Sequence, residues 1–125
     1  MALNMAEFTH DSIINISSAV TTLMPPNSSV YTASKGAVDS ITGVLAKELG
    51  PRKIRVNAIN PGLIVTEGTH SGGFAEGDMK LWFESTAPLR RIGGVDDIAP
   101  SAVYLASDDS KYITGETISI AGGMR

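Results

Sequence analysis

Cysteine is absent from this chain of 125 residues, which excludes disulfide bonds and thiolate catalysis. Histidine is scarce, because His10 and His70 lie far apart and neither belongs to a cluster of ligand residues, so no metal site is predicted. No hydrophobic run is long enough to span a membrane. The first residues lack the basic and then apolar pattern of a secretory signal. We therefore expect a cytoplasmic protein with no membrane partner.

The chain also lacks an excess of charge of either sign. Its 10 Lys and Arg residues stand against 13 Asp and Glu residues, for a net charge of −3. Nucleic-acid-binding proteins carry basic patches, so no nucleic-acid partner is predicted. A hydrophobic content of 42% and a charged content of 18% are typical of a globular protein, and the length fits one domain.

A glycine-rich phosphate-binding loop is missing as well. Neither G-x-G-x-x-G nor T-G-x-x-x-G-x-G occurs, and the nearest glycine cluster, Gly68 to Gly77, has other spacings and follows no strand. Dinucleotide-binding folds normally hold the pyrophosphate at such a loop, where a strand leads into the N-terminus of a helix. The sequence thus contains no recognisable dinucleotide-binding half.

The first half of the chain predicts a strand, a helix and a second strand. The β-branched run Ile13–Ser17 reads as a buried strand and Ile54–Ile59 as the next. Between them a helix is expected from Val30 until Gly50-Pro51 ends it. Its apolar residues recur at steps of three and four and predict one packed face: Ala37, Val38, Ile41, Val44, Leu45 and Leu49. This order indicates a right-handed βαβ unit with parallel strands.

The second half predicts fewer regular elements. Residues 67–78 are rich in glycine and predict a mobile loop, followed by a short helix at Met79–Phe83. Arg90-Arg91 lies in a linker and is interpreted as a solvated charge pair rather than a phosphate site. A helix is expected from Asp96 to about Ala106, and a last strand at Glu116–Ile120. The expected fold class is α/β: half of a doubly wound parallel sheet, with about three strands and flanking helices.

Tyr31 and Lys35 are the most informative residues for chemistry. Four residues apart on a helix, they share one face. A free tyrosine has a pKa of about 10, whereas acid–base catalysis favours a pKa near the working pH. An ammonium roughly 4 Å away lowers the pKa of a phenol by up to about three units. Tyr31 is therefore a candidate general acid or base.

Four segments together resemble the C-terminal half of the short-chain dehydrogenase/reductase family. They are Asn15-Ile16-Ser17-Ser18, Tyr31-Thr32-Ala33-Ser34-Lys35-Gly36-Ala37-Val38, Arg55-Val56-Asn57-Ala58-Ile59-Asn60-Pro61-Gly62 and the run Ile113-Thr114-Gly115-Glu116-Thr117-Ile118-Ser119-Ile120-Ala121-Gly122-Gly123. The resemblance extends over nearly the whole chain but only the second half of the Rossmann-like fold. It implies a single partial domain, residues 1–125, in which the lead at Met1–Phe8 is the end of a longer helix.

The resemblance implies an oxidoreductase that interconverts an alcohol and a carbonyl with NAD or NADP. It assigns proton transfer to Tyr31, orientation of the substrate oxygen to Ser18, and lowering of the Tyr31 pKa to Lys35. The implied cofactor contacts are Tyr31, Lys35, Pro61, Gly62, Ile64 and Thr66. The residues that would separate NAD from NADP, and those that would identify the small-molecule substrate, cannot be read from this sequence. Residues 67–83 would form the substrate lid, with Trp82 or Phe83 touching substrate, packing, or making a subunit contact.

Four further expectations concern the catalytic competence and the assembly of the chain. The family's fourth catalytic residue, an asparagine before the serine strand, has no counterpart, because Asn4 is too close to Ser18. The chain is either a fragment of a longer enzyme or a truncated, inactive domain that acts in subunit assembly. A serine hydrolase using Ser18 is disfavoured, since no G-x-S-x-G surrounds it. Without a first half, Ile13–Ser17 would be an uncovered edge, so we expect a homo-oligomer or a partner that covers it.

Overall fold

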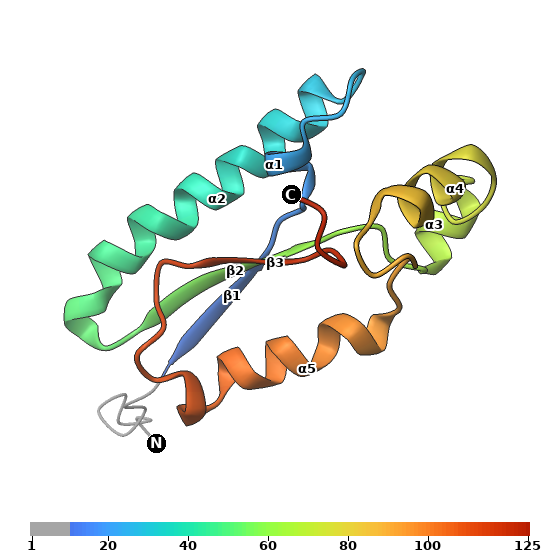
Figure 1. Ribbon diagram of the computed structural model, residues 1–125. Coiled ribbons are helices and arrows are strands. Elements are labelled where there is room, and N and C mark those ends of the chain that lie inside the picture. The colour runs from blue at the N-terminus through green and yellow to red at the C-terminus, as the bar shows by residue number, and fades with distance from the viewer. Residues whose placement is uncertain (1–10) are drawn as a thin grey trace.

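The computed structural model describes residues 11–125 and shows a parallel sheet with helices on both faces (Figure 1). The sheet has three strands in the order β1-β2-β3: β1 is Ser12–Ile16, β2 is Arg55–Pro61 and β3 is Thr117–Ile120. Ile13 of β1 pairs with Val56 of β2, and Ile59 of β2 pairs with Ile118 of β3. The predicted α/β class, with three parallel strands and flanking helices, is therefore confirmed.

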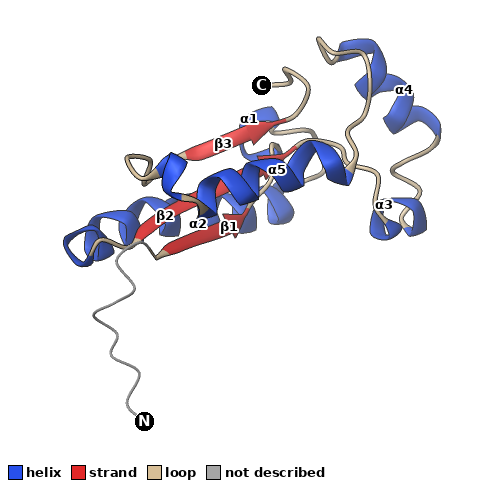
Figure 2. Cartoon of the chain, turned by 90° about the horizontal axis from the view of Figure 1, so that it is seen from below, coloured by secondary structure: helices blue, strands red, loops and turns tan. Residues whose placement is uncertain are grey.

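Two long helices connect the strands and cover the sheet. Helix α2, Ser29–Leu49, follows β1, and helix α5, Val95–Ala106, precedes β3. On one face of β1, Asn15 Nδ2 donates to Thr42 Oγ1 of α2 at 2.9 Å. On the other face, Ser12 Oγ donates to the carbonyl oxygen of Leu105 in α5 at 2.8 Å. Figure 2, seen from below, shows the sheet between these two helices.

The shorter elements gather mainly beyond the carboxyl ends of the strands. Helix α1, Val20–Leu23, follows β1, while α3, Glu67–Ser71, and α4, Gly77–Thr86, follow β2 (Figure 1). Two 3₁₀ turns, η2 at Gly50–Arg52 and η3 at Asp108–Ser110, end α2 and α5. In open α/β sheets, ligands bind at this carboxyl edge. Residues 66–92 therefore lie where a substrate lid is expected.

The predicted apolar face of α2 is only partly correct. The helix ends before Gly50-Pro51 as predicted, but Ile41 and Val44 are 53% and 54% exposed. The fully buried positions are Thr42 and Ala46, neither of which the pattern singled out. The helix thus presents small residues to the sheet, where the backbones come close, and turns larger apolar side chains outward.

The glycine-rich segment also differs from its prediction as an irregular loop. Thr66 caps α3 in a capping box: its Oγ1 accepts from the Thr69 amide at 3.2 Å, and Thr69 Oγ1 accepts from the Thr66 amide at 2.7 Å. The predicted helix at Met79–Phe83 is longer, because α4 runs from Gly77 to Thr86. Glycine content favoured a loop, whereas the hydroxyl cap and the contacts of α4 favour helix.

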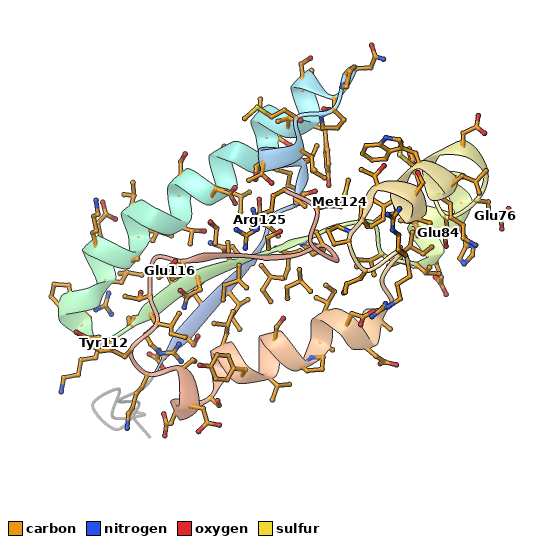
Figure 3. The ribbon with its side chains drawn as sticks, in the orientation of Figure 1. Glu76, Glu84, Tyr112, Glu116, Met124 and Arg125 are labelled. Atoms are coloured by element: carbon orange, nitrogen blue, oxygen red, sulfur yellow. The ribbon has the colours of Figure 1, made fainter. Side chains whose placement is uncertain are left out.

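A small core joins the end of α4 to the sheet. Its buried members come from three parts of the chain: Ala19, Phe83, Ala87, Ala121 and Met124. Figure 3 labels Met124 in this region, just before Arg125 at the C-terminus. Among residues 11–125, no helix has the length and apolar character needed to cross a membrane. The lead at Met1–Phe8 lies outside the described residues.

Candidate active site

Lys35 is tied to the end of β1 through both its backbone and its side chain. Its carbonyl oxygen accepts a hydrogen bond from Ser17 Oγ at 3.0 Å, and its Nζ donates to the carbonyl oxygen of Ile16 at 3.0 Å. Lys35 Nζ also lies 5.9 Å from the centre of the Tyr31 ring, within range of a cation–π interaction. Helix α2 therefore places the Lys35 ammonium group close to both the end of β1 and the Tyr31 ring.

Tyr31 and Ser18 occupy the two sides of the loop between β1 and α2. Tyr31 stands in the first turn of α2 and is 51% exposed, and its hydroxyl has no hydrogen-bond partner within residues 11–125. Ser18 Oγ accepts from the Val20 amide at 3.2 Å, so this hydroxyl caps the chain as it enters α1. The structure thus places Ser18, Tyr31 and Lys35 at the same carboxyl edge of the sheet, with the phenol free to meet a ligand.

Asn60 holds this edge together, and the sequence did not identify it as more than part of a turn. It is buried at the end of β2, and its Nδ2 donates to Asp39 Oδ2 of α2 at 3.1 Å and to Thr21 Oγ1 at 3.2 Å. Thr21 Oγ1 in turn donates to the Ser18 carbonyl oxygen at 3.1 Å. The only available signal was its place at the end of a predicted strand, since its partners are distant in the sequence.

Pro61 and Gly62 pack into the protein as β2 ends. The Pro61 carbonyl oxygen accepts from the Ala19 amide at 2.9 Å, and the Gly62 amide donates to the Ile120 carbonyl oxygen at 2.9 Å. A Cβ at Gly62 would lie 2.8 Å from the Cα of Ala121. The missing side chain of Gly62 therefore permits close contact with the chain's own backbone. The sequence anticipated a close approach, but toward a ligand.

The segment after Gly62 forms a short bridge to the chain before α5. Gly93 donates its amide to Leu63 and accepts from the amide of Val65, each at 2.9 Å. Because successive peptide groups of an extended chain point in opposite directions, those of Ile64 face the other side. There the Ile64 carbonyl oxygen accepts from Thr69 Oγ1 at 2.9 Å, and its amide has no partner in the described chain. Thr66 is occupied as the cap of α3.

An ion pair lies beside this bridge. Arg91 donates from both guanidinium nitrogens to the Asp97 carboxylate at 2.7 Å, and Asp97 also accepts from the Gly94 amide at 2.8 Å. The Arg91 hydrogen bond, with help from the Gly94 amide, holds the pKa of Asp97 below its ordinary value. The Arg91 side chain is 55% exposed, in agreement with its interpretation as solvated, but it also has a fixed partner that the sequence did not indicate.

Arg91 and Asp97 also contribute to a cavity of about 100 Å³. Apolar side chains form most of its remaining wall, among them Leu63, Phe83 and Ile120. Ile64 is the one predicted site residue that lines it. Phe83 is 4% exposed, so it packs, whereas Trp82 beside it is 46% exposed. Of the two aromatic residues left open between substrate contact and packing, Phe83 belongs to the core.

Comparison with known proteins identifies the family of this chain. The family model described as enoyl-(acyl carrier protein) reductase matches residues 2–125. An uncharacterized oxidoreductase of Methylorubrum extorquens is 54% identical over 114 residues, which is 91% of this chain and 46% of the relative. A short-chain type dehydrogenase/reductase from Mycobacterium ulcerans superposes with a TM-score of 0.86 at 33% identity, over 93% of this chain and 42% of that structure. The chain belongs to the short-chain dehydrogenase/reductase family.

A second solved structure adds a ligand to the comparison. The blue fluorescent protein from a metagenomic library, solved in complex with NADPH, superposes with a TM-score of 0.82 at 33% identity. It is covered to 44% of its length, while 90% of this chain is matched. This chain therefore spans about half the length of the proteins it resembles.

The predicted site residues fall into two groups in space. Ser18, Tyr31 and Lys35 lie near the end of β1. The second group is at the end of β2, where Pro61 is the last strand residue and Gly62, Ile64 and Thr66 follow it. Within the described residues, no group of histidine, aspartate and glutamate side chains could hold a metal ion. Asp39, Asn60 and Thr21, which link the two strand ends through α1 and α2, are what sequence reasoning missed.

Proposed function

We propose that this chain is the catalytic half of an NAD(P)-dependent oxidoreductase that interconverts an alcohol and a carbonyl compound. The observation that supports this most strongly is the position of Lys35. Its ammonium lies 5.9 Å from the Tyr31 ring while its backbone is fixed to the end of β1. Tyr31 would exchange a proton with the substrate oxygen at its exposed hydroxyl, and Ser18 would orient that oxygen through a hydrogen bond.

The residues present fit the nicotinamide end of the cofactor. The Lys35 ammonium carries three donors and uses one on Ile16, which leaves donors for ribose hydroxyl groups. The free Ile64 amide offers a backbone donor to a carboxamide, and Pro61, Gly62 and Thr66 flank that position. The bound nicotinamide would supply hydride transfer, which the protein cannot provide. The matching NADPH complex supports this choice of cofactor class.

Cofactor binding tests the proposal directly. NADH and NADPH are titrated into the purified chain while nicotinamide fluorescence is followed, with Lys35→Met as the site variant and Lys47→Met as the control on the same helix. We expect saturable binding that weakens roughly tenfold or more in Lys35→Met, because hydrogen bonds to a charged group are lost. Binding that Lys35→Met and Lys47→Met leave equally intact would contradict the proposed site.

Catalysis by Tyr31 needs a separate measurement. Tyr31→Phe removes only the hydroxyl, so cofactor binding should persist while any carbonyl reduction falls by roughly a hundredfold or more. Reduction is followed as the loss of NADPH absorbance with a panel of ketones and aldehydes. A Tyr31→Phe variant as active as the original chain would exclude Tyr31 as the acid.

The second candidate is a domain that assembles with other subunits and catalyses nothing. Ile13 and Ile16 favour it, because they are 39% and 53% exposed on an edge strand. It predicts a stable oligomer or complex together with no nicotinamide binding at millimolar cofactor. Sedimentation of the chain alone, run beside the cofactor titration, separates the two candidates.

A further inference from the structure

The side-chain amide of Asn60 is buried, and only its nitrogen end has hydrogen-bond partners. Asn60 is 4% exposed, and its Nδ2 donates to Thr21 Oγ1 at 3.2 Å. The same nitrogen lies 3.1 and 3.3 Å from the two carboxylate oxygens of Asp39. Asn60 Oδ1 has no hydrogen-bond partner among residues 11–125. A buried acceptor without a donor costs stability, so we infer that this amide serves the protein through its N–H groups.

The chemistry of the partners fixes the direction of this hydrogen-bond chain. A carboxylate only accepts, so the atom of Asn60 that faces Asp39 is the donor nitrogen. The second N–H of this nitrogen goes to Thr21 Oγ1, which leaves the single hydrogen of the Thr21 hydroxyl for another acceptor. Thr21 Oγ1 donates that hydrogen to the Ser18 carbonyl oxygen at 3.1 Å. The chain therefore runs from Asn60 through Thr21 to Ser18.

The backbone around Ser18 is held by this chain and by its neighbours. The Ser18 carbonyl oxygen also accepts from the Thr21 amide at 3.2 Å, and the Ala19 amide donates to the Pro61 carbonyl oxygen at 2.9 Å. Ser18 Oγ accepts from the Val20 amide at 3.2 Å. That bond uses only a lone pair of the oxygen, so the Ser18 O–H is left to donate to a ligand. These bonds together set the position of the Ser18 hydroxyl.

We propose that Asn60 is a positioning residue for Ser18, because it directs the Thr21 hydroxyl onto the Ser18 carbonyl oxygen and so holds the Ser18 hydroxyl in place for the substrate oxygen. The role toward substrate rests on the proposed function, in which Ser18 orients that oxygen. The hydrogen-bond chain does not rest on it. Asn60→Asp is nearly identical in shape but only accepts, so the Thr21 hydrogen would turn from Ser18 to the new carboxylate.

An exchange of the two side chains separates positioning from packing. Asn60→Asp alone sets a second carboxylate against Asp39 and should lower the urea midpoint. The double variant Asp39→Asn with Asn60→Asp restores an amide–carboxylate pair, with the donor now on α2, so the midpoint should recover. The Thr21 hydroxyl should still donate to position 60 rather than to Ser18. A role in packing alone predicts instead that Ser18 returns to its original state together with the midpoint.

The carbonyl ¹³C resonance of Ser18 reports its hydrogen bonds without cofactor or activity. We expect this resonance to shift in the double variant and in Thr21→Val, and to stay in Thr21→Ser, which keeps the hydroxyl. Thr22→Val is the control, because Thr22 Oγ1 donates to the Ala19 carbonyl oxygen at 3.0 Å in the same helix. An unchanged resonance in Thr21→Val would overturn the hydrogen-bond chain. A resonance that Thr21→Val moves and the folded double variant leaves in place would overturn the role of Asn60.

Carbonyl reduction by NADPH gives the second readout. We expect kcat to fall by roughly tenfold or more in Thr21→Val and in the double variant, because a misplaced hydroxyl slows the reaction. The KM for NADPH should change by less than about twofold, and Thr22→Val should alter neither constant. Full activity in a double variant whose Ser18 resonance has shifted would overturn the positioning role. An original chain that reduces no substrate, with the resonances shifting as expected, would contradict the proposed function and the role toward substrate, but not the hydrogen-bond chain.

Discussion

Gly62 illustrates, at the scale of one residue, how the end of β2 is packed. A Cβ there would meet the Cα and Cβ of Ala121 at 2.8 Å and the Phe83 ring at 3.1 Å. Both Ala121 and Phe83 belong to the core that joins the end of α4 to the sheet. Any side chain at Gly62 would have to move backbone, and would displace the neighbouring candidate cofactor contacts.

Two glycine substitutions should have opposite effects on stability. Gly62→Ala should lower the free energy of unfolding by about 1–3 kcal/mol, as overpacking does. Gly43→Ala, inside α2 with nothing within 4 Å of the added Cβ, should raise it by about 0.5–1 kcal/mol. Urea denaturation of both variants checks this pair. If Gly62→Ala left the free energy of unfolding unchanged, the backbone at Ala121 would be able to move away from the added methyl group.

Arg55 is a buried cation that closes the end of α5. It is 8% exposed, and its guanidinium donates to Ser110 Oγ at 2.9 Å and to the carbonyl oxygens of Leu105 and Ser107 at 2.8 and 3.2 Å. A positive charge at the C-terminus of a helix is favoured by the helix dipole. Arg55 therefore fixes α5 against the start of β2.

Loss of the Arg55 guanidinium should be costly. Arg55→Met keeps an apolar stem but removes the charged donor to Ser110 Oγ and to the carbonyl oxygens of Leu105 and Ser107. We therefore expect about 1–3 kcal/mol less stability. The exposed Arg52→Met serves as the control and should change stability by less than about 0.5 kcal/mol. Equal effects of the two substitutions in urea denaturation would contradict this role.

Residue spacing explains which candidate site residues the sequence could suggest. Ser18, Tyr31 and Lys35 stand in local motifs, and the helix that carries two of them has a clear apolar repeat and a Gly-Pro stop. Asn60 could not be found this way, because its partners Thr21 and Asp39 come from α1 and α2. Contacts across long sequence separations depend on the fold, which a single sequence pattern does not encode.

At the scale of elements, Arg91 and Asp97 join the segment before α5 to its first turn. Asp97 accepts from Arg91 and from the Gly94 amide, so its pKa lies below its ordinary value in the folded chain. A carboxyl group with a lowered folded pKa contributes stability above its unfolded pKa, here 3.8, and loses it as pH falls toward the folded pKa. The start of α5 should therefore be sensitive to acid.

Unfolding measured between pH 3 and pH 7 tests this link. The original chain should exceed Asp97→Asn in stability near neutral pH, and the difference should shrink as pH falls below about 4. The side chains are 55% and 36% exposed, so the difference should also shrink with added salt. Asp96→Asn, on the same turn, provides the control. A difference that is constant from pH 3 to pH 7 would exclude the ion pair as its source.

The ends of the helices could be predicted from local sequence signals more accurately than the side of each helix that is buried. The start of α5 near Asp96 and the end of α2 at Gly50 were predictable from first-turn acids and a Gly-Pro stop. The exposure of Ile41 and Val44 was not, because an apolar stripe shows amphipathic character but not what it faces. The helix at Glu67–Ser71 was obscured by glycines, and only the Thr66 cap marked it.

For the whole molecule, the β1 edge should limit solubility. A flat apolar edge strand invites pairing between chains, and a lysine on such a strand opposes it. Ile16→Lys should therefore reduce concentration-dependent light scattering while stability changes by no more than about 1 kcal/mol, since Ile16 is 53% exposed. Thr117→Lys on β3 is the control and should leave scattering unchanged. Equal light scattering by the original chain and both variants would mean that aggregation does not depend on the β1 edge.

The hydrogen bonds between Leu63–Val65 and Gly93, each 2.9 Å long, hold the two ends of the intervening segment next to one another. That segment is therefore a closed loop. The entropy cost of closing such a loop grows only with the logarithm of its length. Residues 66–92 should therefore be replaceable by a segment of another length or sequence. A segment from a relative should fold in this place if it keeps apolar residues at Phe83 and Ala87, which anchor it to the sheet, and the strands would not have to be rebuilt.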